Sequence, residues 1–391
     1  DQTTTTAPTS SEQVPSQEEI VQKQEQEPQE EQIQKLVQSN VTLSEQDEQR
    51  IKNILSIAEE CIQEEELRLL ISKKPQPVCY DGFEPSGRIH IAQGIMKAIN
   101  VNKLTANGCK FIFLVADWFA LMNNKMGGDL KKIQTVGKYM IEVWKSAGMD
   151  LTNVEFVWSS EIINERPNEY WLLVLDIARK NNLSRILRCS QIMGRTASED
   201  LSAAQIFYPC MQCADIFFLK ADICQLGTDQ RKVNMLAREY CDQIKRKFKP
   251  IILSHHMLLG LSGEKMSKSD PMLAIFMDDD ANMVNSKVKK AFCPPGQIEN
   301  NPVLEYLRYI IFPKNEEFLV ERSEKDGGNK LYKNYQEVED DFKSLALHPG
   351  DVKPALAKAL NSILQPVRDH FKNNAEARKL QEQVHKYKVT K

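Results

Sequence analysis

Five short apolar runs alternate with segments of helical pattern in the middle of the chain, and this alternation constrains the fold most strongly. The runs predict strands at residues 78–80, 109–115, 154–158, 221–224 and 251–254. The remaining segments predict helices at about 94–106, 128–147, 168–182, 208–219 and 230–246. Short apolar strands separated by helices are typical of a parallel sheet that is covered on both faces. The pattern therefore predicts a doubly wound, Rossmann-like α/β domain, in which ligands bind at the carboxyl ends of the strands.

The segment before this pattern differs from it in composition. Residues 1–42 are rich in Gln and Glu, and eight acidic residues against two lysines give a charge of −6 over the first 40 positions. Such a segment buries too little apolar surface to offset its ordering entropy, and we expect it to be disordered. A helical pattern starts at Ser44, which is spaced from Asp47 as in a capping box, and continues to about Ser72.

The segment after residue 270 contains no further apolar strand run and predicts a second, mainly α-helical domain. Helices are expected at about 284–292, 302–311, 334–345 and 351–372. The predicted organisation is therefore an acidic tail (1–42), an α/β domain (43–270) and a helical domain (271–391).

The composition fits a globular protein without a global charge bias. The 391 residues are 41% hydrophobic and carry a net charge of −3, so any contact with nucleic acid has to use a local patch. No apolar run is long enough to span a membrane. Nine cysteines are spread along the chain, several of them in apolar runs, which favours reduced thiols in a cytoplasmic protein. Cys210 and Cys213 are the only close pair and lack further ligands at zinc spacing, so no metal site is expected.

Two loops at predicted strand ends carry residues that suit phosphate groups. Gly82 and Gly87 follow the first strand and let a ligand approach the backbone, and His90 stands at the start of a helix, where anions are favoured. Residues 265–269, Lys-Met-Ser-Lys-Ser, follow the last strand, and their ammonium and hydroxyl groups suit a polyphosphate. Each motif alone has an ordinary alternative, which is a structural histidine or a solvated basic turn.

A third group of residues lies on the predicted helix at 208–219. Tyr208, Gln212 and Asp215 are spaced i, i+4 and i+7, which places them on one face of a helix. Polar side chains on an otherwise apolar face need partners when they are buried. A ligand with a hydroxyl and an ammonium group would provide partners, and a satisfied polar network in the core is the alternative.

The two loops together resemble the signature motifs of a known enzyme class. Residues 90–93, His-Ile-Ala-Gln, resemble the HIGH signature of class I aminoacyl-tRNA synthetases, and residues 265–269 match the KMSKS signature letter for letter. The pair is specific because one motif follows the first strand of the predicted sheet and the other follows the last. Gln93 departs from the signature, since it replaces the second histidine by a side chain that cannot be charged.

Residues 208–215 and 225–232 narrow this resemblance to the tyrosyl-tRNA synthetases of archaeal and eukaryotic type, over about residues 43–373. The resemblance implies a two-step reaction. ATP activates L-tyrosine to tyrosyl-adenylate with release of pyrophosphate, and the tyrosyl group then passes to the terminal adenosine of tRNA(Tyr). Mg²⁺ is expected to accompany ATP.

The resemblance also implies roles for individual residues. Tyr80 and Asp215 are expected to bind the phenol hydroxyl, and Tyr208, Gln212 and Gln230 to bind the α-ammonium group. The expected ATP-binding residues are Gly82, His90, Gln93, Gly227, Asp229, Lys265, Met266, Ser267, Lys268 and Ser269. His90, Lys265 and Lys268 are also expected to be catalytic, because they would stabilise charge on the reacting phosphate and the pyrophosphate. Bound phenylalanine would leave the buried Asp without a partner. This can favour tyrosine over phenylalanine by about 10⁵, a magnitude already known for tyrosine-activating enzymes of this class.

Contacts with tRNA follow from the same resemblance. Arg231 and Lys232 are expected near the first acceptor pair, and Asp351 is expected to read the anticodon guanine. The family commonly places an aromatic residue before the Gly-Gly pair at 327–328, but this chain has Asp326 there, so we expect a hydrogen bond or a weaker grip in place of stacking. Residues of about 183–207 correspond to the insert through which family members dimerise, and a cytoplasmic homodimer is therefore expected.

Three other functions compete with this interpretation. Tryptophan activation would not need the hydroxyl partners Tyr80 and Asp215. A small-molecule adenylyltransferase would not need the helical domain or Asp351. A catalytically silent RNA-binding protein would not need to keep His90 and the polar face at 208–215.

Overall fold

The structure is a computed structural model that describes residues 43–195, 200–264, 266 and 270–387. The predicted acidic tail at 1–42 lies outside the described residues. Four residues of the KMSKS-like motif, Lys265, Ser267, Lys268 and Ser269, lie outside them as well.

A six-stranded sheet with strand order β1-β6-β5-β2-β3-β4 forms the centre of the larger part of the molecule. The strands are β1 (Glu60–Ile62), β2 (Val78–Phe83), β3 (Lys110–Val115), β4 (Val154–Trp158), β5 (Ile223–Cys224) and β6 (Ile251–Ser254). Strands β2 to β6 pair in parallel, whereas β1 pairs antiparallel with β6. The chain order reverses direction between β2 and β5, and such a switch point is where doubly wound sheets bind ligands. The predicted α/β fold class is confirmed.

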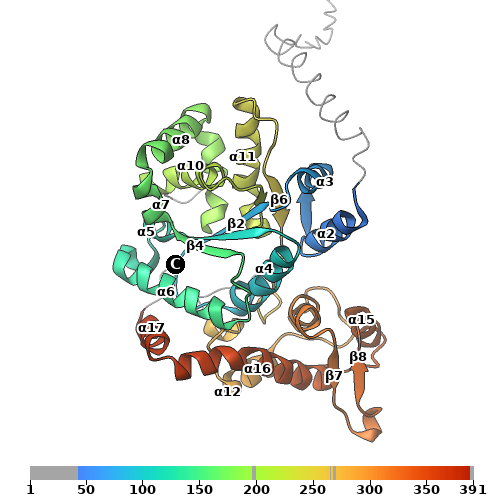
Figure 1. Ribbon diagram of the computed structural model, residues 1–391. Helices are drawn as coiled ribbons and strands as arrows, with labels where there is room; N and C mark the ends of the chain where they lie inside the picture. Colours follow the sequence, from blue (N-terminus) through green and yellow to red (C-terminus); the bar gives the residue numbers. More distant parts are fainter. Residues whose placement is uncertain (1–42, 196–199, 265, 267–269, 388–391) are drawn as a thin grey trace, which may run out of the picture.

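Helices lie on both faces of this sheet (Figure 1). They are α2 (Glu45–Leu55), α3 (Glu64–Lys73), η1 (Ala92–Met96), α4 (Lys97–Ala106), α5 (Asp117–Met122), η2 (Lys125–Gly128), α6 (Leu130–Ser146), α7 (Ser159–Glu165), α8 (Pro167–Lys180), α9 (Leu183–Leu187), η3 (Ser190–Met193), α10 (Ala203–Phe218), η4 (Thr228–Gln230) and α11 (Arg231–Gln243). Side chains alternate along β2: Cys79 packs into the core on the α6 side, and Tyr80 packs into the core on the α10 side. This period of two aims Tyr80 at the helix that carries Tyr208 and Asp215.

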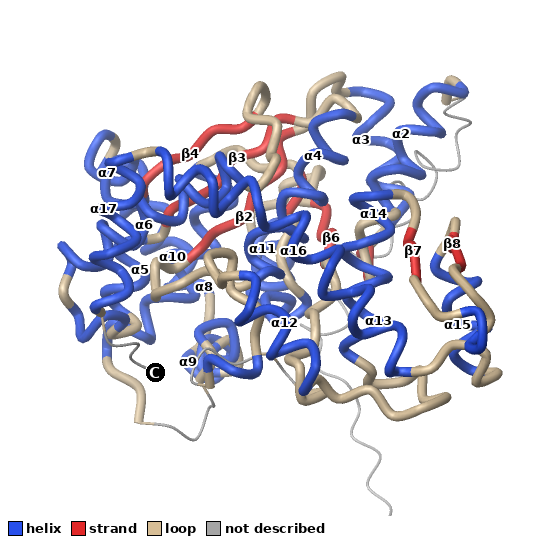
Figure 2. Tube along the Cα trace, turned by 90° about the horizontal axis from the view of Figure 1, so that it is seen from below, coloured by secondary structure: helices blue, strands red, loops and turns tan. Residues whose placement is uncertain are grey.

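The rest of the chain is mainly helical and lies along one side of the sheet domain (Figures 1 and 2). It contains η5 (Pro271–Leu273), α12 (Ala281–Lys290), α13 (Pro302–Tyr306), η6 (Leu307–Ile311), α14 (Phe312–Asn315), β7 (Phe318–Val320), η7 (Glu324–Asp326), β8 (Lys330–Tyr332), α15 (Tyr335–Lys343), α16 (Pro349–Asn373) and α17 (Ala375–Lys386). Both views place α17 beside α6 of the sheet domain. Among the described residues, no helix is long and apolar enough to cross a membrane.

Several sequence-based boundaries were wrong. The helical pattern predicted from Ser44 to about Ser72 is divided into α2, which ends at Leu55, and α3, which ends at Lys73, because residues 60–62 pair with β6 at the sheet edge. Ser44 does cap α2, as its hydroxyl accepts a hydrogen bond from the amide of Asp47. Helix α10 starts five residues before the predicted 208, at a capping box that Ser202 forms with Gln205.

The helical part also contains elements that the sequence did not predict. Strands β7 and β8 form a two-stranded antiparallel sheet where no strand was expected. Their connection includes Gly327 and Gly328, both with a positive φ that other residues rarely adopt. The last helix, α17, was missed, and the side chain of Asn374 caps it by accepting from two backbone amides.

Candidate active site

A cavity of about 1030 Å³ opens at the carboxyl ends of β2, β5 and β6. It lies at the switch point, where the strand order predicts a ligand site. Of the residues predicted to bind tyrosine or ATP, every one that the structure describes lines this cavity. They are Tyr80, Gly82, His90, Gln93, Tyr208, Gln212, Asp215, Gly227, Asp229, Gln230 and Met266.

The deep end of the cavity holds the carboxyl group of Asp215. Its Oδ1 accepts a hydrogen bond of 2.8 Å from the hydroxyl of Tyr170, a residue on α8 that sequence reasoning missed. Its Oδ2 is buried and has no hydrogen-bond partner among the described residues. Burial raises the pKa of Asp215 to about 8, although the hydrogen bond from Tyr170 opposes the shift. An unpaired buried carboxyl oxygen beside Tyr80 fits a ligand that brings a hydroxyl group.

Polar side chains in the middle of the cavity form hydrogen bonds with one another. The amide nitrogen of Gln212 donates to the side-chain oxygen of Gln230 over 3.0 Å, and Gln230 donates in turn to the carbonyl of Ile192 over 3.0 Å. The hydroxyl of Tyr208 donates to Glu84 over 2.6 Å. Glu84 adds a carboxylate to a region of amide and hydroxyl oxygens, and such a group of acceptors suits a cationic ligand group.

Glu84 was not predicted as a site residue. It directly follows β2, the strand that carries Gly82 near its end. Asn123 of the loop after α5 donates to both carboxylate oxygens of Glu84, at 3.0 and 3.1 Å. Its place between Gly82 and His90 in the sequence is a signal that could have identified it.

The third region of the cavity contains Gly227 and the turn that carries His90. A Cβ atom on Gly227 would lie 2.6 Å from the sulfur of Met257 and 2.7 Å from a carboxylate oxygen of Asp229, so a larger residue would have to displace these two side chains. His90 precedes η1, and its backbone forms an isolated antiparallel bridge with Phe276. The side-chain oxygen of Gln93 is buried, and no described residue provides a hydrogen bond for it.

A buried lysine on α4, Lys97, lines the cavity, joins the strand ends there and was also missed. Lys97 is 2% exposed, forms an ion pair with Asp81 of β2, and donates to the backbone carbonyl of Gln225 over 3.0 Å. The amide of Gln225 contacts Nδ1 of His255, which follows β6, over 2.8 Å. Burial lowers the pKa of Lys97 and raises that of Asp81 to about 6, although the charge of Lys97 opposes the latter shift. This network ties the carboxyl ends of β2, β5 and β6 together.

The residues predicted to contact tRNA lie outside the cavity lining. Arg231 starts α11 directly after Gln230, and its guanidinium pairs with Glu60 at 2.9 Å. Lys232 is the next residue and is exposed. Asp351 lies in the first turn of α16, and Asp326 accepts a hydrogen bond of 2.6 Å from the hydroxyl of Ser323.

Comparison with known proteins agrees with this geometry. The family model described as tRNA synthetases class I (W and Y) matches residues 72–365. The cytoplasmic tyrosine–tRNA ligase 1 of Arabidopsis thaliana is 65% identical over 351 residues, which cover 89% of this chain and 91% of the relative. A Leishmania major tyrosyl-tRNA synthetase in complex with tyrosinol superimposes with a TM-score of 0.83 at 52% identity, covering 88% of this chain and 61% of that one. The Archaeoglobus fulgidus enzyme in complex with L-tyrosine gives 0.78 at 38% identity, covering 83% and 99%.

The chain therefore belongs to the class I aminoacyl-tRNA synthetases of the tryptophan and tyrosine group. Its identity to relatives that it matches almost from end to end places it, within that group, among the tyrosine–tRNA ligases. The resemblance predicted from the two signature motifs is confirmed.

Proposed function

We propose that this chain activates L-tyrosine with ATP and transfers the tyrosyl group to tRNA(Tyr). The observation that carries the proposal is the unpaired carboxyl oxygen of Asp215 at the deep end of a cavity that also contains the HIGH-like turn. Two similar structures, one in complex with tyrosinol and the other with L-tyrosine, support the choice of substrate. The expected cytoplasmic location agrees with the name of the Arabidopsis relative.

In the proposed substrate complex, tyrosine lies along the line from Asp215 to Glu84. Asp215 and Tyr80 bind the phenol hydroxyl, and this contact supplies the missing partner of Asp215. Gln212, Gln230 and Tyr208 hold the ammonium group, and Glu84 adds a negative charge there through its contact with Tyr208. This placement turns the tyrosine carboxylate toward the region of His90 and Gly227.

The chemical step needs positioning and charge stabilisation rather than a covalent intermediate with the protein. A tyrosine carboxylate oxygen attacks the α-phosphorus of ATP, and the bond to pyrophosphate breaks. His90 stabilises the charge on the α-phosphate, and Lys265 and Lys268 stabilise the pyrophosphate. Gly82, Gly227 and Asp229 accommodate the nucleoside, with Gln93, Met266, Ser267 and Ser269 as further contacts to ATP.

Mg²⁺ enters the proposal as a companion of the ATP phosphates, whose negative charge it neutralises. Within the described ranges of the chain, no group of three or more His, Cys, Asp or Glu side chains could hold a metal ion. We therefore assign no protein ligands to it.

The helical part after residue 270 is proposed to bind the anticodon, with Asp351 as the acceptor for guanine and Asp326 beside the hairpin of β7 and β8. Arg231 and Lys232 are proposed to meet the acceptor end, because they directly follow the cavity residue Gln230 on the chain. Such phosphate contacts position the tRNA without reading its sequence.

The function is tested by ATP–pyrophosphate exchange with each of the twenty amino acids. We expect exchange with tyrosine and at most a trace with phenylalanine, because only tyrosine pairs the carboxyl group of Asp215. Exchange with tryptophan would support the competing synthetase specificity. The absence of exchange with all twenty would contradict the proposal.

We further propose that the chain forms a homodimer through α8, α9 and the start of α10. Large apolar side chains are exposed there, including Leu172 (68% exposed), Leu183 (60%) and Phe207. Figure 1 shows α8 and α10 side by side. We propose that their exposed apolar side chains form one surface at the predicted insert of residues 183–207. A surface of this kind marks a protein interface.

The double substitution Leu172→Glu and Leu183→Glu should convert the dimer to a monomer, because it places buried charges in an apolar interface. Light scattering after size exclusion should report the mass of two chains for the unchanged protein and of one chain for the variant. Leu319→Glu, at an exposed leucine of β7 (45% exposed), is the matched control and should stay dimeric. A monomeric unchanged protein at micromolar concentration would refute this part of the proposal.

A further inference from the structure

A buried acidic pair lies where the HIGH-like turn meets the helical part of the chain. Asp278 and Asp279 follow the KMSKS-like motif in sequence, and their side chains are 1% and 3% exposed. Neither residue lines the cavity in the part of the chain that the structure describes. Buried carboxylates need partners, and the identity of these partners indicates what the pair does.

The backbone next to this pair is attached to the turn that holds His90. The amide of Ile91 donates to the carbonyl of Ile275 over 2.8 Å, and the amide of Met277 donates to the carbonyl of Ile89 over 2.9 Å. These two bonds flank the bridge between His90 and Phe276. Residues 275–277 therefore act as a short antiparallel partner of residues 89–91.

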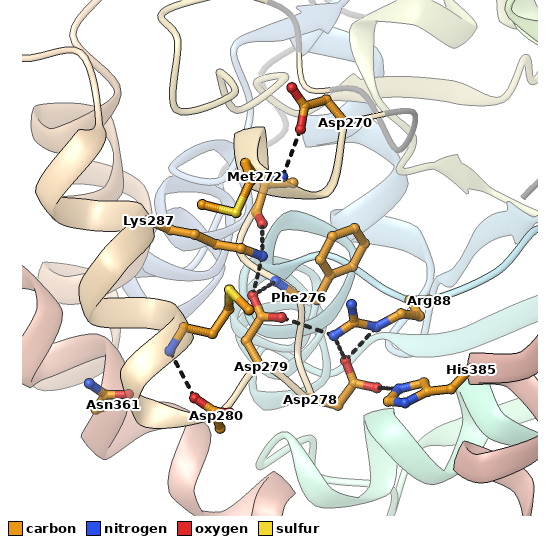
Figure 3. Close-up of polar contacts among 12 residues, drawn as sticks. Arg88, Asp270, Met272, Phe276, Asp278, Asp279, Asp280, Lys287, Asn361 and His385 are labelled. Atoms are coloured by element: carbon orange, nitrogen blue, oxygen red, sulfur yellow. Dashed lines mark hydrogen bonds and ion pairs between the residues drawn. The ribbon is translucent and has the colours of Figure 1, made fainter.

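Side chains reinforce this attachment. Arg88 donates from Nε to Asp278 and from Nη2 to Asp279, each over 2.9 Å, and its guanidinium stacks on the ring of Phe276 (Figure 3). Lys287 of α12 approaches Asp279 within 2.6 Å. Gly94 adds a packing constraint, because a Cβ atom there would lie 2.2 Å from the sulfur of Met277.

Asp278 also joins two helices that lie far apart in the sequence. Its Oδ2 accepts from the hydroxyl of Tyr139 on α6 over 2.9 Å. Nε2 of His385 on α17 lies 2.5 Å from the same oxygen (Figure 3). Burial alone would raise the pKa of Asp278, but the hydrogen bond from His385 and the charge of Arg88 outweigh it and hold the pKa well below its usual range. The carboxylate is therefore charged at neutral pH and binds three elements at once.

We propose that Asp278 is a positioning residue for adenylate formation, which fixes the turn of His90 by binding Arg88 and couples that turn to the C-terminal helix α17 through His385. This inference rests on the proposed function of the cavity. Asp278 does not touch the proposed tyrosine position. It acts on the phosphate side alone, through Arg88 and residues 275–277.

The proposal is tested with Asp278→Asn, which keeps the shape of the side chain and removes its charge. We expect kcat for ATP–pyrophosphate exchange to fall by about 10- to 100-fold, because a displacement of about 1 Å at a reacting group can cost 10² in rate. The KM for tyrosine should stay within about twofold of the unchanged protein, since Asp215, Gln212 and Gln230 keep their partners. Rates are expressed per active site, counted by the burst of tyrosyl-adenylate.

His385→Ala is the second variant, and it keeps the proposal testable should Asp278→Asn fail to fold. His385 lies near the exposed end of α17, and its loss should lower kcat per active site by about two- to tenfold, the factor that one hydrogen bond is worth. Asp341→Asn is the matched control, because Asp341 also accepts from a tyrosine hydroxyl (Tyr332, 2.8 Å) and a cation (Lys330, 2.6 Å), but within the helical part alone. It should leave kcat unchanged.

The outcomes distinguish a failure of the role proposed for Asp278 from a failure of the proposed function. Loss of active sites with unchanged kcat per site in both variants would mean a purely structural role and would overturn the proposal. A proportional rise of the KM for tyrosine would overturn it too, because the effect would not be confined to the phosphate side. If the unchanged protein shows no exchange with tyrosine, the proposed function fails first.

Discussion

Asp215→Ala should lower kcat/KM for tyrosine by about 10²-fold, because the buried phenol hydroxyl then lacks a partner, at a cost of ~1–3 kcal/mol. The same change should raise kcat/KM for phenylalanine. In the unchanged protein, bound phenylalanine leaves Oδ2 of Asp215 buried without a partner, and the alanine variant removes this penalty. Discrimination should therefore fall from about 10⁵, the magnitude known for tyrosine-activating enzymes, to about 10², the limit of a pocket that only senses shape.

The measurement is ATP–pyrophosphate exchange with tyrosine and phenylalanine on the same preparations. Asp222→Ala is the matched control, because Asp222 is a half-buried aspartate directly before β5, at the end of the strands that faces away from the cavity. It accepts from Lys74 over 2.5 Å and from the amide of Val78 over 2.7 Å. Its loss should lower stability without changing the ratio of the two substrates. A variant of Asp215 that loses activity toward both amino acids equally would show that Asp215 does not read the hydroxyl.

Two rules predicted the place of this site from the sequence, namely the helix repeat and the order of parallel strands. Tyr208, Gln212 and Asp215 lie on one face of α10 because the helix repeat puts them there. The loops after β2 and β5 meet because the carboxyl ends of parallel strands lie on one edge of a sheet. Period and strand order therefore predicted the position of the cavity, whereas the roles of Tyr80, Gly227, Asp229 and Gln230 came from the family resemblance.

The residues that were missed depend on contacts between distant segments. Tyr170 bonds to Asp215 across 45 residues, and Lys97 bonds to Gln225 across 128. A lysine in a helical pattern is ordinarily expected on the solvent side. No local rule states that Lys97 turns inward to Asp81. Strand β1 was missed for the same reason, since only its pairing with β6 makes residues 60–62 extended.

Lys97→Met should lower the free energy of unfolding by about 3–5 kcal/mol at neutral to alkaline pH, the cost of leaving one member of a buried ion pair without its partner. The methionine fills a similar volume, so most of the loss reflects the charge of Asp81 and the carbonyl of Gln225. The surface pair of Lys110 and Glu155, 2.6 Å apart and at least 40% exposed at both ends, gives the matched control. Lys110→Met should cost no more than ~1 kcal/mol.

The loss of stability in Lys97→Met should depend on pH, whereas a loss caused by packing alone should not. Burial already raises the pKa of Asp81 to about 6, and removal of Lys97 raises it further above the value in the unfolded chain. Below about pH 6 both folded proteins hold this proton, whereas above that value only the variant still does. The additional loss of stability in the variant therefore grows as pH rises above about 6 and is smaller at pH 5 than at pH 8. Denaturant unfolding followed by tryptophan fluorescence at these two pH values measures the difference. A loss of stability that is equal at both pH values, or equal to that of Lys110→Met, would contradict a charged pair in the wall of the cavity.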